Sequence, residues 1–203
     1  MSRLGIVINL DTCRDHHSCM LACKREKNSF LGSHYIETFT AMSDKFPNPN
    51  TYFIPILCQH CSNPSCVPAC PKGVFTVRKD GIVAVGNTEV CKSCKDKPCV
   101  KACPYGAIDY DPVTGMIGKC DMCASLIDQG KTPACVNECL TNSLLFGDLD
   151  DPESTVSQLI ASRSEDIHQL KPETGNKPNV YYILSKKEWK DCKDLYSPAW
   201  HNK

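Results

Sequence analysis

The spacing of cysteines constrains most strongly what this chain can fold into. Fifteen of its 16 cysteines fall into four short groups, and one stands apart. Groups two and three share the pattern C-x2-C-x4-C-V-x-A-C-P-x-G, offset by 33 residues, and such a repeat identifies the building unit of a fold. The four groups are Cys13, Cys19 and Cys23; Cys58, Cys61, Cys66 and Cys70; Cys91, Cys94, Cys99 and Cys103; and Cys120, Cys123, Cys135 and Cys139.

This spacing indicates iron–sulfur clusters. Three closely spaced cysteines hold three corners of a cubane cluster, and a fourth, three residues later and followed by proline, ligates the neighbouring cluster. Structural zinc is an alternative, but one zinc tetrahedron uses two separated cysteine pairs and not four thiolates within 13 residues. Disulfides or metal storage are further alternatives, and a disulfide framework of this density is typical of short secreted chains.

Composition excludes other classes of function. Lys plus Arg equals Asp plus Glu at 23 each, so the net charge gives no indication of nucleic-acid binding. The apolar stretch at the N-terminus is interrupted by Asn9 and Asp11, which makes it too short and too polar for a signal peptide. The chain contains no run of about 18 apolar residues that would span a membrane. Its own sequence therefore predicts a cytoplasmic protein.

Short strands and turns are expected between the cysteine groups. The predicted strands are 4–10, 52–57 and 180–184, and the predicted hairpins are 74–85 and 107–118. Single helical turns are expected around the third and fourth cysteine of each group. One longer helix is predicted over 152–163, with Asp151 as its N-cap and Pro152 at its first position. Because these elements offer little apolar core, bound clusters are expected to supply much of the folding energy.

Further motifs accompany the cysteine groups. ACPYGAI follows group three, KCDMCASLIDQGKTPACVNEC contains group four, FGDLDDPES follows it, and PETGNKPNVYYIL lies near the end. In this combination the chain resembles the four-cluster, ferredoxin-type electron-transfer subunit of the dimethyl sulfoxide reductase superfamily of molybdopterin enzymes. The resemblance covers nearly the whole chain. Leu140 is a small departure, because the family often has proline after group four.

The resemblance implies an α+β fold of two fused bacterial-ferredoxin-like modules, each with two [4Fe-4S] clusters. Short strands, hairpins and single-turn helices would build both modules. Groups one and four would form one module from residues 1–57 with 104–147, and groups two and three an inserted module from 58–103. Residues 148–203 would form a C-terminal extension of helix and strand that wraps the second cluster pair and docks on a partner.

The resemblance also implies which residues hold each cluster. Groups one and four pair, as do groups two and three, and the last cysteine of each group ligates the cluster of the other group in its pair. The implied ligands are Cys13, position 16, Cys19 and Cys139 for cluster 1; Cys120, Cys123, Cys135 and Cys23 for cluster 2; Cys58, Cys61, Cys66 and Cys103 for cluster 3; and Cys91, Cys94, Cys99 and Cys70 for cluster 4.

Position 16 holds histidine where this set calls for cysteine. His16 would complete sixteen ligands for four cubanes, and imidazole nitrogen is a competent iron ligand, as in Rieske centres. A neutral imidazole in place of a thiolate would make cluster 1 less negative and raise its reduction potential. One alternative is a [3Fe-4S] cluster held by three cysteines, with His16 a bystander. Another is an absent or differently ligated cluster, and His17 is displaced by one residue from the expected spacing.

Other residues have two readings each. His60, inside the first C-x2-C of group two, either donates a hydrogen bond to cluster sulfur or faces solvent. Lys119, directly before group four, either raises the potential of that group's cluster or is a solvated lysine. Tyr105 is predicted to pack over a cluster and exclude water. Cys192 is predicted to be a free thiol, with a ligand role as the alternative, and the tail 194–203 either docks on a partner or packs on this chain.

The expected function is electron transfer without bond chemistry of its own. No Ser/His/Asp constellation, phosphate-binding glycine loop or carboxylate pair indicates a catalytic site. The resemblance implies a wire between a large molybdopterin catalytic subunit and a soluble carrier, a membrane anchor or a quinol-oxidising subunit. Neither nucleic acid nor a direct substrate would bind.

Two alternatives concern the role of the clusters. The chain would be a mainly structural iron–sulfur subunit of a molybdopterin enzyme acting on aromatic hydroxyl compounds, or a stand-alone polyferredoxin. The resemblance also allows an alternative to the cytoplasm, because partners in the family often carry a twin-arginine signal. The folded subunit would then be exported with its partner and become membrane-associated.

Overall fold

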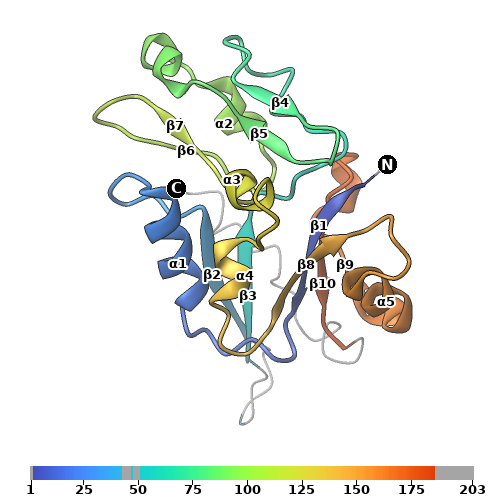
Figure 1. Ribbon diagram of the computed structural model, residues 1–203. Helices are drawn as coiled ribbons and strands as arrows, with labels where there is room; N and C mark the ends of the chain where they lie inside the picture. Colours follow the sequence, from blue (N-terminus) through green and yellow to red (C-terminus); the bar gives the residue numbers. More distant parts are fainter. Residues whose placement is uncertain (1, 43–46, 48–50, 186–203) are drawn as a thin grey trace.

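Residues 2–42, 47 and 51–185 are described by a computed structural model (Figure 1). Cys192 and the tail 194–203 lie outside these residues, so the expectations for them stay predictions. The described elements are β1 (Leu4–Asn9), α1 (Ser18–Lys27), β2 (Ile36–Met42), β3 (Thr51–Leu57), β4 (Phe75–Val77), β5 (Val83–Val85), η1 (Thr88–Ser93), α2 (Pro98–Ala102), β6 (Asp109–Tyr110), β7 (Ile117–Gly118), α3 (Ala124–Ile127), α4 (Ala134–Asn137), β8 (Leu144–Asp148), α5 (Thr155–Ser162), η2 (Ser164–Asp166), β9 (Ile167–His168), η3 (Pro172–Thr174) and β10 (Val180–Ile183).

A four-stranded sheet in the order β8-β1-β10-β9 joins the N-terminal and C-terminal segments (Figure 1). β1 runs antiparallel to β8 and parallel to β10. One face packs against α5, where Val7, Val156 and Ile183 form a small core. The other face, with Ile6 and Tyr182, belongs to the main core. β1 is therefore buried on both faces, which explains its continuous apolar sequence and confirms the predicted strand.

The hairpin β2–β3 lies between α1 and this sheet, and α4 contacts both α1 and β8 (Figure 1). Its seven residue pairs run from Ile36 opposite Leu57 to Met42 opposite Thr51. Ile36, Ile54 and Leu57 are almost fully buried in the main core. The helices α1 and α4 contact each other, and both carry cysteines that face this core.

The hairpins β4–β5 and β6–β7 lie with η1 and α2 at the top of the molecule in Figure 1. Both lie where hairpins were predicted, and a second core fills the space between them. Apolar side chains of Phe75, Val83, Ile108 and Ile117 pack there against cysteines of groups two and three. The segment that follows group three therefore packs with groups two and three. The mixed helices and strands confirm the α+β class.

The predicted helical turns hold for groups three and four and are wrong for the other two. Helices α2 and α4 are short, but α1 extends over ten residues. Its sequence is rich in helix formers, and Lys24, Arg25 and Lys27 lie in its last turn, where cations suit the helix dipole. In the described structure group two forms turns and no helix, because Pro68 has no amide hydrogen to donate to a helical hydrogen bond. No helix among the described residues has the length and apolar character to cross a bilayer.

The predicted N-cap of the longer helix is wrong. Helix α5 begins after Ser154, whose hydroxyl accepts a hydrogen bond from the amide of Ser157 at 3.2 Å. The carboxylate of Asp151 instead accepts from the amide of Glu153 at 2.9 Å and closes a turn before the helix. Both side chains are suited to capping, and the position of the chain on β8 decides between them: the Ser154 hydroxyl also donates to the carbonyl of Asp148.

Asn179 joins three distant segments at the upper end of the sheet. Its side-chain amide donates to the carbonyl of His60 at 2.7 Å, and its Oδ1 accepts from Arg3 Nη1 at 3.0 Å. The carbonyl of Asn179 accepts from the amide of Ile6. The approach is so close that a Cβ on Gly5 would lie 2.5 Å from the Asn179 carbonyl oxygen. Asn179 is 1% exposed, so water cannot replace these bonds.

Asn179→Ala is expected to lower the free energy of unfolding by about 1–3 kcal/mol, because it leaves the buried His60 carbonyl without its donor. Asn63→Ala is the matched control: that side chain is exposed and makes one hydrogen bond at 3.2 Å, so its loss should stay within about 0.5 kcal/mol. Urea unfolding of the cluster-loaded protein under anaerobic conditions, followed by far-ultraviolet circular dichroism, measures both. Equal midpoints for the two variants would contradict the role assigned to Asn179.

Candidate metal-cluster sites

Fifteen cysteines lie in the described part of the chain, and all of them are free thiols. The disulfide alternative is therefore wrong for these residues. Most of the thiols are buried, and Cys70, Cys94, Cys103 and Cys139 are half-buried. So many buried thiols without disulfides in one small protein are typical of metal ligands.

The thiols lie together in four sets, which their pKa values reveal. Burial, and then the charges of Cys13 and Cys139, raise the pKa of Cys19 to about 11. Burial and then Cys123 raise the pKa of Cys23 to about 12. The thiols that line one cavity, or that act on one another's pKa, make up site 1 (Cys13, Cys19, Cys139), site 2 (Cys23, Cys120, Cys123, Cys135), site 3 (Cys58, Cys61, Cys66, Cys103) and site 4 (Cys70, Cys91, Cys94, Cys99).

Each set combines cysteines of one sequence group with the last cysteine of a second group. Cys139 of group four lies with group one, and Cys23 of group one lies with group four. Cys103 of group three lies with group two, and Cys70 of group two lies with group three. The structure thus places the thiols next to one another in the same combinations as the predicted ligand sets.

Helical spacing explains why the last cysteine of each group lies in a different set from the others. Cys19 and Cys23 lie four residues apart in α1, so their side chains leave the same helical face one turn apart. One thiol enters site 1 and the other enters site 2. Cys135 in α4 and Cys139 just after it repeat the arrangement. Because α1 and α4 contact each other, they hold sites 1 and 2 side by side.

The thiols of sites 2 and 3 surround cavities. One cavity is lined by all four cysteines of site 2, and another by all four of site 3. Among the described residues, no three His, Cys, Asp or Glu side chains converge closely enough to hold a single metal ion. Thiols spread around a volume fit a multi-iron cluster better than one tetrahedral zinc ion.

Backbone amides point at several of the sulfurs. The amide of Met122 donates to Cys120 Sγ at 3.3 Å, and the amide of Ser143 donates to Cys139 Sγ at 3.2 Å. Burial would raise the pKa of Cys139, but hydrogen bonds from the amides of Leu144 and Ser143 outweigh it and lower that pKa. Such donors stabilise a thiolate and moderate the negative charge of a bound cluster.

The four sites form a continuous series. Burial, then Cys23 and Cys123 of site 2, and then Cys19 of site 1 raise the pKa of Cys135, so sites 1 and 2 adjoin. After burial, the first charge that raises the pKa of Cys120 is Cys58, which joins site 2 to site 3. The single turn of α2 separates Cys99 of site 4 from Cys103 of site 3. The order along the molecule is therefore 1, 2, 3, 4.

His16 lies in the loop between Cys13 and α1, and its side chain is exposed. Its neighbours Asp15 and His17 have positive φ angles of 54° and 58°, which turn the loop sharply. His17 Nε2 lies 2.8 Å from Asp15 Oδ1. The adjacent histidine thus already has a carboxylate partner.

His60 and Lys119 are both buried, which overturns the solvent-facing reading of each. His60 is fully buried, and its Nδ1 accepts a hydrogen bond from the amide of Val83 at 3.1 Å. Burial, then the charge of Lys119, hold its pKa well below the ordinary value, so the ring is neutral with its proton on Nε2. Lys119 is 3% exposed, and its ammonium donates to two backbone carbonyls.

The wall of site 3 contains polar residues from several segments. Tyr105 lines the cavity and is buried, as predicted. Gln59 and Asn176 also line it, although neither was predicted from the sequence. Gln59 had a signal, since it follows Cys58 directly. Asn176 had none, because it reaches the site from a distant segment.

The comparisons with known proteins agree with this geometry. The 4Fe-4S dicluster domain family matches residues 49–149. The arsenate respiratory reductase iron–sulfur subunit of Shewanella sp. strain ANA-3 is 34% identical, over 90% of this chain and 97% of its own. A sulfite dehydrogenase subunit of Allochromatium vinosum is 36% identical, over 92% and 85%. A tetrathionate reductase subunit of Salmonella typhimurium is 33% identical, over 89% and 72%.

The match to the dicluster domain covers the cysteines of groups two, three and four, and the relatives align with about nine-tenths of the chain. Their names describe subunits of two reductases and a dehydrogenase, and that of the Shewanella protein specifies an iron–sulfur subunit. The buried free thiols and the cavities among them fit the same cofactor. The chain belongs to the ferredoxin-type iron–sulfur subunits of the molybdopterin oxidoreductases.

Proposed function

We propose that this chain conducts electrons through four clusters in a row, between a large molybdopterin catalytic subunit and a second electron carrier. The continuous series of four thiol sites carries the proposal. Bound clusters supply one-electron oxidation and reduction. The chain's own residues supply the ligands, fix the order of the sites and exclude water. It has no catalytic role by itself.

The proposed ligands are the thiols of the four sites, with His16 added to site 1. The support for His16 is its spacing from Cys13 and Cys19 and its position in the same loop. The pairing of His17 with Asp15 favours His16 over its neighbour. Sites 2, 3 and 4 each have four thiols, which suits a [4Fe-4S] cluster. A [3Fe-4S] cluster in site 1 is the alternative that the His16 variants below test.

We also propose two ferredoxin-like modules, one around sites 1 and 2 and one around sites 3 and 4. The first comprises residues 1–57 with 104–147, and the second is the insertion 58–103. The packing of α1 on α4 supports the first, and the core around Phe75 and Val83 supports the second. The hairpin β6–β7 contributes Ile117 to that second core although it follows the insertion in sequence. Residues 148–203 are the extension, and their described part supplies an inner strand of the main sheet.

The thiols' high pKa values couple cluster binding to folding. Burial raises the pKa of Cys23, Cys61 and Cys66 to about 12 in each case, so these groups are neutral thiols before they bind iron. Iron binds thiolate, so loading releases protons. Cluster binding thus contributes to the stability of the core that these thiols line.

Site 1 is proposed to face the catalytic subunit. Its Cys139 is half-buried, whereas all four cysteines of site 2 are buried. Leu21 and Leu140 beside these cysteines are 70% and 72% exposed, which is unusual for large apolar side chains next to a buried site. The surface around Cys13–Cys23 and Cys139 is therefore the proposed docking face for a partner.

The iron content tests the number of clusters. Anaerobically purified protein should contain about 16 irons per chain, because four cubanes hold four irons each, or about 15 with one [3Fe-4S] cluster. Metal analysis together with acid-labile sulfide measures this. Zinc in place of iron, with little sulfide, would contradict the proposal.

The docking face predicts an effect of charge on assembly. Leu21→Glu with Leu140→Glu should greatly reduce co-purification with the molybdopterin subunit from the native host, because the charges would be desolvated in the interface. Val113→Glu is the control: Val113 is 90% exposed, but it lies in the β6–β7 turn, away from site 1. The ratio of the two subunits after affinity purification is the measurement. An intact complex with the double variant would exclude this face.

The role of His16 predicts opposite outcomes for two substitutions. His16→Cys should keep a cubane in site 1 and lower its midpoint potential, because a thiolate disfavours the added electron. His16→Ala should convert the site to a three-iron form with a signal in the oxidised protein. Electron paramagnetic resonance during a redox titration measures both, with His17→Ala as control. If wild type already gives the oxidised three-iron signal and His16→Ala leaves it unchanged, His16 is a bystander.

A further inference from the structure

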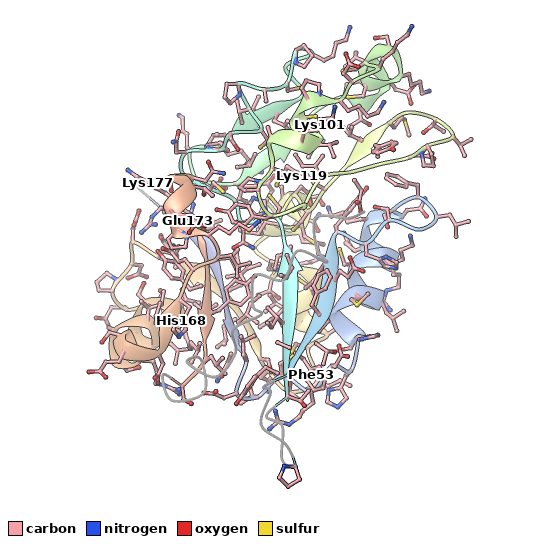
Figure 2. All side chains as sticks on the ribbon, turned by 180° about the vertical axis from the view of Figure 1, so that it is seen from behind. Phe53, Lys101, Lys119, His168, Glu173 and Lys177 are labelled. Atoms are coloured by element: carbon pink, nitrogen blue, oxygen red, sulfur yellow. The ribbon has the colours of Figure 1, made fainter. Side chains whose placement is uncertain are left out.

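Lys119 is a buried lysine at the junction between the upper hairpins and the rest of the molecule (Figure 2). It follows β7 directly and precedes Cys120 of site 2. Within the described part of the chain no carboxylate forms an ion pair with it, and it is only 3% exposed. A buried ammonium without a negative partner is costly, so this position requires a physical reason.

Three neighbours fix the position of the ammonium. Its Nζ donates to the carbonyl oxygens of Val83 at 2.5 Å and of Cys120 at 2.7 Å. It also lies 5.9 Å from the centre of the Phe75 ring, within range of a cation–π interaction. An ammonium has three N–H donors, and these two carbonyls use two of them. One donor is left for whatever fills the adjacent cavity.

That cavity belongs to site 3. Lys119 lines it together with the four thiols of the site. Burial has the largest effect on the pKa of Cys66 and of Cys103 and raises both, and the charge of Lys119 opposes that rise at each. At Cys120, by contrast, the charges that follow burial are those of other thiols, Cys58 first. The side chain therefore acts on site 3, although its place in the sequence is next to a ligand of site 2.

We propose that Lys119 is a fixed positive charge that raises the reduction potential of the cluster held in site 3. The inference rests on the proposed function, because it requires a cluster at that site. Reduction adds one electron to the cluster and breaks no bond. The added negative charge is attracted by an ammonium that two carbonyls already hold in place, so no reorganisation is needed to stabilise it. The thiolates of the cluster in turn supply the negative partner that the buried lysine otherwise lacks.

The surroundings of site 3 strengthen this assignment. His60 Nε2 is a buried polar atom without a hydrogen-bond partner among the described residues, and the buried Tyr105 hydroxyl interacts with the thiol of Cys61. Tyr105 lines the cavity of site 3, and His60 follows Cys58 by two residues. These groups and Lys119 make a polar, water-poor environment in which a charge acts strongly. Site 3, at the junction of the two pairs of sites, then holds an electron more readily than it would without Lys119.

Redox titration of the cluster-loaded protein, monitored by electron paramagnetic resonance, tests the proposal. Lys119→Met, which keeps most of the length of the side chain but removes its charge, should lower the midpoint potential of one cluster. A tenfold loss in the equilibrium constant for reduction is the minimum expected, which is about 59 mV for one electron. The shifted cluster should be the one whose signal Cys66→Ser alters. Lys119→Arg, which retains the charge, should restore most of the potential.

Lys101→Met is the matched control, because Lys101 is exposed in α2 and its charge is screened by water. It should leave all potentials unchanged. The iron content of each variant is measured first, and if Lys119→Met holds fewer clusters, Lys119→Gln is titrated under the same criterion. Unchanged potentials, or a shift at site 2 alone, would overturn the proposal. Loss of the site 3 cluster from the wild type itself would instead refute the proposed function.

Discussion

The rest of the structure depends on one constraint: two cysteines that lie one helical turn apart enter two adjacent sites. Cys19 and Cys23 in α1 share a face, yet each completes a different set of thiols. Cys135 and Cys139 do the same from α4 and the residues just after it. Neither helix can move without disturbing two sites at once. The sheet, the hairpins and the C-terminal strand all pack so that these short helical segments stay in position.

Much of the fold was predictable where local sequence decides structure. β1 and β10 are continuous apolar runs, and Gly81 marks the turn of the hairpin β4–β5 with a φ of 83°. The strands β2 and β8 were missed, and β8 is a short run soon after a cysteine group. The pairing of β1 with both β8 and β10 was beyond reach, since it depends on contacts between opposite ends of the chain.

The candidate sites, too, could be predicted from the sequence only in part. Cysteine spacing was enough to define four groups along the sequence, but which groups share a site was implied only by the resemblance to a known family. The burial of His60 and Lys119 could not be read from their neighbours in sequence. Both depend on Val83, whose amide donates to one and whose carbonyl accepts from the other. Even the sequence adjacency of Lys119 to Cys120 was misleading, because the side chain turns towards the cavity of site 3.

The place of β10 between β1 and β9 has a consequence for biosynthesis. The central sheet cannot close while residues 180–183 are still on the ribosome, although β1 is among the first segments to be made. Until then β1 lacks its parallel neighbour, and the carbonyl of His60 lacks the amide of Asn179. Under the proposed function, a cluster at the junction would reach its final surroundings only after residues 180–183 have been made. Loss of β10 would leave the fifteen grouped cysteines in the chain but remove the strand that closes the sheet.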